Sequence, residues 1–439
     1  MTFHRFLFNY AILIALFFVL SLSLATSDVK SGFILLSLIC FIVSIVAGRL
    51  FFSENSKICR IIQIAFLIKL SIGVCHYLLF FDADYFSGNG EIMQIFQNDF
   101  TSYFHYVQEL IDIKQVEGIF AFDNSTRMVS HQPLLNVIAT CMYSFGANAM
   151  NIVPLNTLFG NLAAINTVLI ISHLRSEKKE YLSSSKLAGL MWLMTLFPLV
   201  LDNAIFVRDI TGQFLMTIAA AMLLLSESRW QFLLLIPAAY LMSMQRDAYF
   251  IAVVVVFAYM KFVYGNSINP FSMIVGVIGV VIMANFIGES GTEMVTASTA
   301  SNVGFFPLRF FMALVGPFPW SQFLNAFYIP SFASQLYNYF LGIIHVACLF
   351  LIFFRHGFSG ALWKNPLAVM GLVIFLLGVI NSHMHITYIA AGTYFLVPLV
   401  YLHFKNKEFS SALIVSFCFL FMLNIFWIAI GGMGLKAVV

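Results

Sequence analysis

Apolar and polar residues fall in long alternating blocks along this chain, and most apolar blocks have the length of a membrane-crossing helix. A helix needs about 20 consecutive apolar residues to cross the hydrocarbon core of a bilayer. On that criterion we predict an all-α polytopic membrane protein with about 13 transmembrane helices. The predicted spans are 6–25, 33–52, 61–81, 152–173, 187–203, 210–226, 230–244, 248–263, 271–288, 333–354, 366–382, 386–403 and 411–430.

One stretch, residues 82–132, interrupts the apolar pattern and concentrates acidic side chains. The acidic residues are Asp82, Asp84, Glu91, Asp99, Glu109, Asp112, Glu117 and Asp123. Only Lys114 and Arg127 oppose them. Because so many charged groups are costly to bury, we expect the stretch to lie in water or at the membrane surface.

An amphipathic juxtamembrane helix is predicted inside this acidic stretch. The apolar residues that share one helical face are Phe100, Tyr103, Phe104, Val107, Leu110 and Ile111. Glu109 and Asp112 are expected on the wet face, and Asp99 stands at the N-terminal end. Asp99 has two interpretations, a helix N-cap or a general base that takes a proton from a hydroxyl nucleophile. Asp82 and Asp84, at the end of the third predicted span, are rival candidates for the base.

The distribution of basic residues orients these elements. Arg49, Lys57 and Arg60 lie between the second and third predicted spans, and the positive-inside rule places them in the cytoplasm, so the acidic stretch is expected outside. Segment 133–145 is then expected to lie in the outer interface or to re-enter, because a full crossing would carry the basic cluster at 175–186 outside. The predicted regions are N-terminal transmembrane helices 1–81, an extracytoplasmic loop with juxtamembrane helices 82–150, a central bundle 151–288, a second extracytoplasmic loop with surface helices 289–332, and C-terminal transmembrane helices 333–439.

Composition excludes a soluble fold. Hydrophobic residues make up 61% of the chain, charged residues only 9%, and the mean hydropathy is +0.94. The net charge of +3 sums loops on two sides of a membrane, and we expect no nucleic-acid partner. The six cysteines lie in or beside apolar spans without CxxC spacing, so we expect small buried residues, with neither a disulfide framework nor a zinc site.

Two Arg-Asp pairs occupy short predicted outer turns, where an isolated charge close to hydrocarbon would be expensive. They are Arg208 with Asp209 and Arg246 with Asp247. Each pair alone is typical of snorkelling or mutually paired boundary residues. Two arginines on one face also indicate a phosphate site, because guanidinium groups bind phosphate oxygens in a bidentate manner. The phosphate carrier expected at a membrane surface is a lipid.

A histidine doublet, His383 and His385, lies in another predicted outer turn, and Arg309 emerges on the same face. A metal site would need further ligands beyond one HxH pair, so we predict no metal site here. The doublet is either a hydrogen-bonded interfacial pair or a group that binds a sugar or a pyrophosphate.

The segment after the acidic stretch has a recognisable order of features. A helix that contains proline ends in a Phe-Gly turn, and an Asn- and Gly-containing span and a basic loop follow. The residues concerned are Pro133, Phe145, Gly146, Asn156 and Gly160, with a DxxxY motif upstream at Asp99 and Tyr103. This order resembles the GT-C superfamily of integral membrane glycosyltransferases, in particular its family-39-like bacterial members.

The resemblance implies a GT-C-like fold in the bacterial cytoplasmic (inner) membrane, with the active site on the extracytoplasmic face. It implies a transferase that moves a sugar from a polyprenyl-phosphate or polyprenyl-diphosphate donor to a saccharide or lipid-linked acceptor. Asp99, with Asp82 or Asp84, would serve as the base. The substrate- and phosphate-binding groups would be Arg208, Asp209, Arg246, Asp247, Arg309, His383, His385, Tyr103 and Arg127. A divalent cation is optional in that superfamily, and nothing in this sequence demands a cofactor.

Two other functions fit the same composition. One is a polymerase of O-antigen or capsule repeat units, which uses polyprenyl-diphosphate-linked oligosaccharides. The other is a flippase or transporter of lipid-linked saccharides, a class that predicts internal repeats and ionisable residues in mid-span. Lys69 is the one obvious charge deep in a predicted span, and it is interpreted either as snorkelling or as paired within the bundle.

Overall fold

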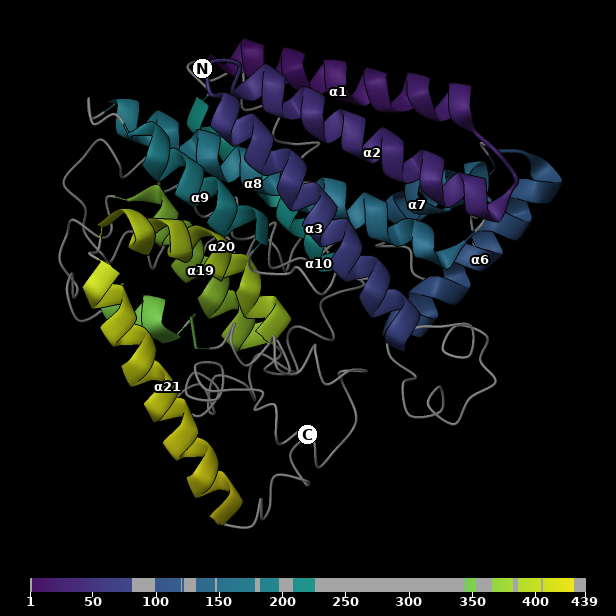
Figure 1. Cartoon of the computed structure of the whole chain (residues 1–439). Helices are drawn as coiled ribbons and strands as arrows, with labels where there is room; N and C mark the ends of the chain where they lie inside the picture. Colours follow the sequence, from purple (N-terminus) through teal and green to yellow (C-terminus); the bar gives the residue numbers. More distant parts are fainter. Residues whose placement is uncertain are drawn as a thin grey trace, which may run out of the picture. The chain divides into compact units, whose positions relative to one another are not determined.

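The part of the chain that the computed structural model describes is helical, with no strand. It comprises residues 2–80, 99–119, 121, 132–146, 148–177, 182–196, 208–225, 343–344, 346–352, 365–381, 386–403 and 406–429. The elements (Figure 1) are α1 (Phe3–Leu24), α2 (Val29–Phe51), α3 (Ser56–Phe80), α6 (Asp99–Glu117), α7 (Gln132–Ser144), the short 3-10 helix η1 (Ala149–Asn151), α8 (Ile152–Glu177), α9 (Ser184–Leu196), α10 (Arg208–Leu225), α19 (Pro366–Asn381), α20 (Ile386–His403) and α21 (Asn406–Ala429).

Four helices in the described residues are long and apolar enough to cross a membrane. They are α1, α2, the Ser56–Cys75 part of α3 and the Ile152–Arg175 part of α8. The prediction of an α-helical membrane protein is therefore confirmed. The predicted total of about 13 spans stays a prediction, because the spans at 230–244, 248–263 and 271–288, and most of 333–354, lie outside the described residues.

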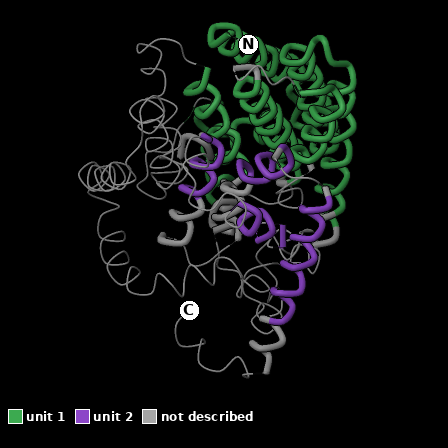
Figure 2. The backbone as a smooth tube through the Cα atoms, turned by 90° about the vertical axis from the view of Figure 1, so that its left-hand side faces the viewer, with its two compact units in different colours: residues 1–245 green, residues 246–439 purple. Residues whose placement is uncertain are grey.

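The chain divides into two compact units, Met1–Gln245 and Arg246–Val439, which Figure 2 colours separately. In the first unit α8 is the central helix, because it packs against α2, α3, α9 and α10. In the second unit α19 packs against α20, and α20 contacts α21.

Polar residues in the turns cap the N-termini of helices in the first unit. The Asp28 carboxylate accepts a hydrogen bond of 2.8 Å from the Ser31 backbone N–H, which caps α2 and lowers the pKa of Asp28. The Asn55 side chain accepts one of 3.3 Å from the Ile58 N–H in the first turn of α3. These caps satisfy backbone donors that a helix start leaves without partners.

The outer surface of α1 is apolar. Phe8, Ile14 and Phe18 are exposed on it, whereas Phe6 and Tyr10 are buried against the rest of the unit. The predicted burial of all six cysteines is wrong for two of them, since Cys75 and Cys418 are exposed. A lipid-facing surface requires exposed apolar side chains on long helices. A helix satisfies its backbone hydrogen bonds internally, so its apolar side chains can face the lipid.

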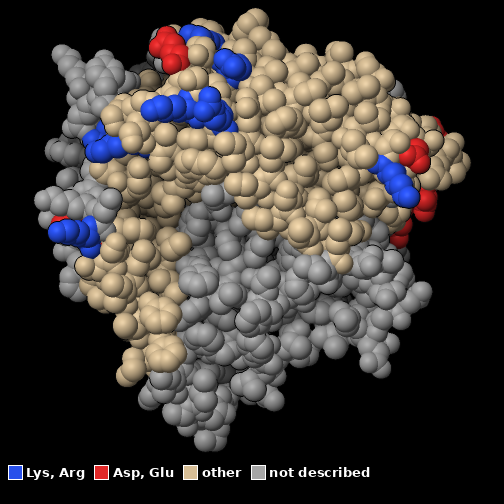
Figure 3. Space-filling model, viewed as in Figure 1, with Lys and Arg blue, Asp and Glu red and all other residues tan. Residues whose placement is uncertain are grey.

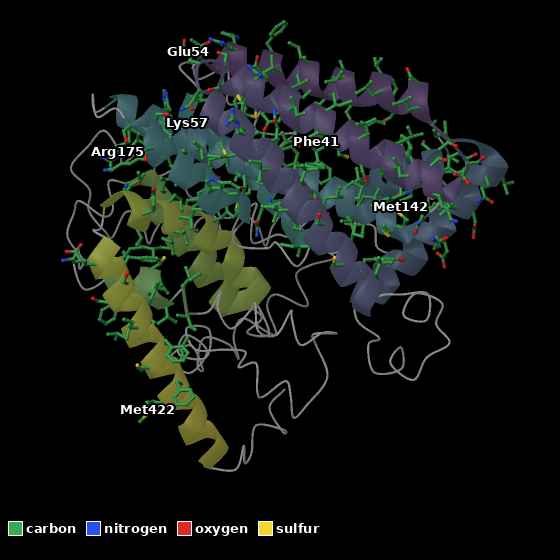
Figure 4. The ribbon with its side chains drawn as sticks, in the orientation of Figure 1. Phe41, Glu54, Lys57, Met142, Arg175 and Met422 are labelled. Carbon is green, nitrogen blue, oxygen red and sulfur yellow. The ribbon has the colours of Figure 1, made fainter. Side chains whose placement is uncertain are left out.

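The two ends of the first unit carry different turns. At one end the Asn55 side chain of the α2–α3 turn donates a 3.2 Å hydrogen bond to the Ser184 hydroxyl at the start of α9. Glu54, Lys57 and Arg175 lie at this end in Figure 4. Lys and Arg side chains gather there beside an acidic group, and further acidic side chains gather with a basic group toward the other end (Figure 3). The two basic turns therefore share one side, as the positive-inside rule predicted.

Candidate functional site

The end of the first unit away from the basic turns is built by α6 and α7, which pack against each other close to the turn that joins α1 to α2 (Figure 1). Helix α6 begins at Asp99, as predicted, and contains Tyr103 one turn later. Val107, Leu110 and Ile111 are buried, whereas Glu109 and Asp112 are exposed. The predicted amphipathic helix is confirmed over the residues whose side chains the structure describes.

Lys114 has a structural role at the end of α6. Its ammonium group donates hydrogen bonds of 3.1 Å to the Ile119 carbonyl oxygen and 2.8 Å to that of Ala121. Gly118 adopts a positive φ of 100°, which turns the chain back over the helix end. Lys114 is 1% exposed, and desolvation lowers its pKa. This cation therefore holds carbonyl oxygens at the helix end and is not directed at the acidic side chains around it.

Helix α7 ends against the α1–α2 turn. The Thr26 backbone N–H donates a 2.9 Å hydrogen bond to the Ser144 carbonyl, and Gly146 then turns the chain at a φ of 84°. A Cβ built on Gly32 of α2 would lie only 2.2 Å from the Phe145 carbonyl oxygen, so the backbones are in direct contact. At 13 residues, α7 is about 20 Å long, shorter than a hydrocarbon core of about 30 Å. The interfacial or re-entrant placement of this segment stays a prediction.

Helices α8 and α10 run parallel, and α10 begins deeper in the bundle than α8. A Cβ built on Gly160 would lie 3.9 Å from Ile210 Cγ2, and the Asn166 side chain donates a 3.2 Å hydrogen bond to the Thr217 hydroxyl. This register places the first residue of α10, Arg208, about 9 Å along the helix axis from the start of α8. The prediction that Arg208 and Asp209 lie at an outer turn stays a prediction, because the burial of neither side chain is described.

Polar side chains run along the buried surface of α8, the span whose asparagine and glycine content the sequence analysis noted without assigning a role to its other polar residues. The buried residues are Asn156, Thr157, Asn161, Asn166 and Thr167. Asn166 is hydrogen-bonded on both sides, since its amide oxygen also accepts a 2.6 Å bond from the Tyr10 hydroxyl. The recurrence of polar residues at intervals of four and five residues, at 157, 161 and 166, within an apolar span was the available sequence signal.

Lys69 is the second feature that sequence analysis left outside its candidate site. It lies on α3, is 5% exposed, and its Nζ would be 2.9 Å from a Cβ built on Gly160. Its burial excludes a snorkelling lysine, and no ion pair joins its ammonium group to any of the side chains whose placement the structure describes. A buried cation therefore lies between α3 and α8, at the level of the first turn of α10.

The predicted site residues divide between described and other positions. Asp99 and Tyr103 lie in α6, and Arg208 and Asp209 lie in α10, all within the first unit. Helix α6 packs against α7 and helix α10 against α8, so the two pairs of residues belong to different helix pairs. The remaining candidates, which lie outside the described residues, are Asp82, Asp84, Arg127, Arg246, Asp247, Arg309, His383 and His385. Among the described residues, no group of three or more His, Cys, Asp or Glu side chains is placed to hold a metal ion.

The fold and these positions define the class of the protein. It is an α-helical membrane protein whose first unit has a basic end, an acidic end and polar side chains buried along its central helix. No family model matches the chain, and neither the curated proteins nor the solved structures contain a match to it.

Proposed function

We propose that the protein is a membrane glycosyltransferase. It transfers a sugar from a polyprenyl-phosphate-linked donor to an extracytoplasmic saccharide or lipid-linked acceptor, in the cytoplasmic membrane of a bacterium. One observation carries the proposal: the acidic amphipathic helix α6 lies at the end of the first unit away from the basic turns, and α10 begins with Arg208 in the half nearer that end. Carboxylates and a cation beside a lipid surface are what transfer from a lipid phosphate requires.

The proposed chemistry assigns a role to each group. The acceptor hydroxyl oxygen bonds to the anomeric carbon of the sugar while the bond from that carbon to the phosphate oxygen breaks. A carboxylate takes the hydroxyl proton, and Asp99 is the leading candidate, with Asp82 and Asp84 as rivals. The phosphate leaves with the bonding electron pair, and the arginines, Arg208 first, stabilise its charge.

The test uses Asp99→Asn, with Asp112→Asn as its matched control. Both carboxylates belong to α6, and the control removes an exposed acid near the other end of the helix. The full-length variants would be purified, reconstituted with polyprenyl-phosphate-linked sugars and an acceptor, and assayed for a new glycosidic bond. Loss of a general base lowers the rate by about 10²–10⁴-fold. We expect that loss for Asp99→Asn and near wild-type transfer for Asp112→Asn.

Two results would contradict the proposal at different levels. Full transfer by Asp99→Asn would remove Asp99 from the catalytic role and direct the test to Asp82 and Asp84. The absence of glycosidic product with every lipid-linked donor, including oligosaccharide diphosphates, would reject the transferase itself.

A second candidate function is a flippase or transporter of lipid-linked saccharides. The buried Lys69 favours it, because ionisable residues in mid-span mark transport pathways. Movement of a fluorescent lipid-linked sugar across liposomes, without formation of a glycosidic bond, is the result that would establish this candidate over the transferase.

A further inference from the structure

The space that Lys69 occupies is made by a glycine. Because a Cβ on Gly160 would come within 2.9 Å of Lys69 Nζ, any larger residue at this position would displace the ammonium group. Gly160 is eight residues into α8, so the ammonium group lies about 12 Å along the helix axis from its start. This depth is within the hydrocarbon layer, where a lysine is expensive to keep.

Few carboxylate side chains belong to the described helices that pack around Lys69. Helix α3 packs against α2, α8 and α9, and in these three helices the only carboxylate is Glu177, seventeen residues beyond Gly160. Asp209, in the first turn of α10, is the nearest other acid in the sequence of the neighbouring helices. A buried ammonium group without an opposite charge costs several kcal/mol, so an anionic ligand would supply what the protein leaves out.

The first turn of α10 lies beside this cation. The position of a Gly160 Cβ is 3.9 Å from Ile210, the third residue of α10, and 2.9 Å from Lys69 Nζ. The start of a helix carries unpaired N–H groups and the positive end of its dipole. A lysine and a helix start repel each other in a dry site unless an anion lies between them, and phosphate is the anion that helix starts bind most often.

Gln213 supplies an independent donor on the same helix. It is 3% exposed, and its Nε2 has no hydrogen-bond partner among the residues that the structure describes. It follows Ile210 by three residues and precedes Thr217 by four, and both of these face α8, so all three share one stripe of α10. A buried amide donor without a partner costs about 1–3 kcal/mol, which an anionic oxygen would recover.

We propose that Lys69, the first turn of α10 and Gln213 form a binding site for a phosphate group. Basic pockets between membrane helices bind lipid phosphates, which makes a lipid-borne phosphate ester the first candidate ligand. The identification of the ester as the polyprenyl-phosphate donor rests on the proposed function, whereas the phosphate site itself does not. Free inorganic phosphate is the other source of the same chemistry.

The test measures binding directly, with polyprenyl monophosphate in detergent and, separately, with inorganic phosphate. The variant Lys69→Met keeps the length of the side chain and removes its charge. Lys57→Met is the control, because Lys57 is an exposed lysine near the start of the same helix. One charged hydrogen bond corresponds to about a 10- to 100-fold change in Kd. We expect that weakening for Lys69→Met and for Gly160→Ala, and unchanged binding for Lys57→Met.

Each outcome decides a separate question. Binding of inorganic phosphate alone, with the same dependence on Lys69, supports the site and makes free phosphate its ligand. Unchanged binding of both probes by a folded Lys69→Met protein overturns the site. If Lys69→Met fails to fold, Gly160→Ala and Lys69→Arg test the same cavity with the charge retained, and wild-type binding by both overturns it.

Further results distinguish the phosphate site from a structural ion pair and from the proposed transferase activity. If Asp209→Asn restores the stability that Lys69→Met has lost, Lys69 is the partner of a structural ion pair and the phosphate site is wrong. Lys69-dependent binding without any glycosidic product supports the site and rejects the proposed transferase. Glycosyl transfer by Lys69→Met with an unchanged KM for the donor supports the proposed transferase and rejects the phosphate site.

Discussion

The contact between α2 and the end of α7 gives a sharp test of how the first unit is held together. In Gly32→Ala the new Cβ would lie 2.2 Å from the Phe145 carbonyl oxygen, whereas real Cβ contacts stay beyond 3.0 Å. The carbonyl belongs to the backbone and has no rotamer with which to move aside. The two segments must therefore separate by about 0.8 Å. The substitution is expected to destabilise the protein, although replacing a helical glycine by alanine usually stabilises a helix.

The size of the effect follows from the bonds that such a separation would break. The Phe145 carbonyl accepts a buried 2.8 Å hydrogen bond from the Asn151 side chain, and the Ser144 carbonyl accepts one of 2.9 Å from the Thr26 N–H. Each is worth about 0.5–1.5 kcal/mol, and the overlap itself costs about 1–3 kcal/mol. The better helix propensity of alanine offsets about 1 kcal/mol. We expect a net loss of about 1–5 kcal/mol in the free energy of unfolding.

The control is Gly48→Ala on the same helix. The one tight contact of its Cβ would be Ile62 Cδ1 at 3.2 Å, the tip of a flexible side chain that can rotate away, whereas Cys59 Cα at 3.6 Å is at ordinary van der Waals distance. Thermal unfolding in detergent can be followed with a thiol-reactive dye once the exposed Cys75 and Cys418 are replaced by serine in every variant. The dye then reports exposure of buried thiols such as that of Cys40 on α2. In a domain of 150–250 residues each kcal/mol lowers Tm by about 2–4 °C. Gly32→Ala should melt several degrees below Gly48→Ala, and equal or reversed Tm values would refute the close backbone contact.

Two smaller predictions use the same preparation. Tyr10→Phe removes the 2.6 Å hydrogen bond to Asn166 and leaves a buried acceptor, so the free energy of unfolding should fall by about 1–3 kcal/mol; an unchanged Tm would mean that the bond contributes nothing. Lys114→Met frees the carbonyl groups of Ile119 and Ala121, so deuterium uptake after α6 should rise while Glu109→Gln leaves it unchanged. Equal uptake in both variants would remove Lys114 from its capping role.

Sequence analysis predicted the helices that depend on apolar length alone. The first span, predicted at 6–25, is α1 at Phe3–Leu24, and the span predicted at 152–173 begins at the same residue as α8. These agree because the length of an apolar run and its end signals are local properties. The amphipathic face of α6 was predictable for the same reason, since Val107, Leu110 and Ile111 share a stripe at helical spacing.

Contacts between distant helices were not predictable from the same patterns. Gly32 contacts Phe145, which is more than a hundred residues away in the sequence. Lys69 lies against Gly160 because α3 turns this side chain toward α8. Periodicity gives the face of a helix but not its partner or its depth. Lys69 was therefore left as either snorkelling or paired, and the register that starts α10 about 9 Å along the axis from the start of α8 was not predicted.

Depth separates the polar groups of the first unit into two kinds. Asn166 lies about 21 Å from the start of α8, and both sides of its amide are occupied by Tyr10 and Thr217. Near the level of Gly160, by contrast, Lys69 is buried, and the buried Gln213 Nε2 has no hydrogen-bond partner among the described residues. Substitution of a polar group that hydrogen-bonds two helices together should lower stability. Substitution of a polar group that binds a ligand should weaken binding. Tyr10→Phe and Lys69→Met are therefore expected to have opposite profiles: lower Tm with intact phosphate binding for the first, and weaker binding with an equal or higher Tm for the second, because the unpaired buried charge is gone.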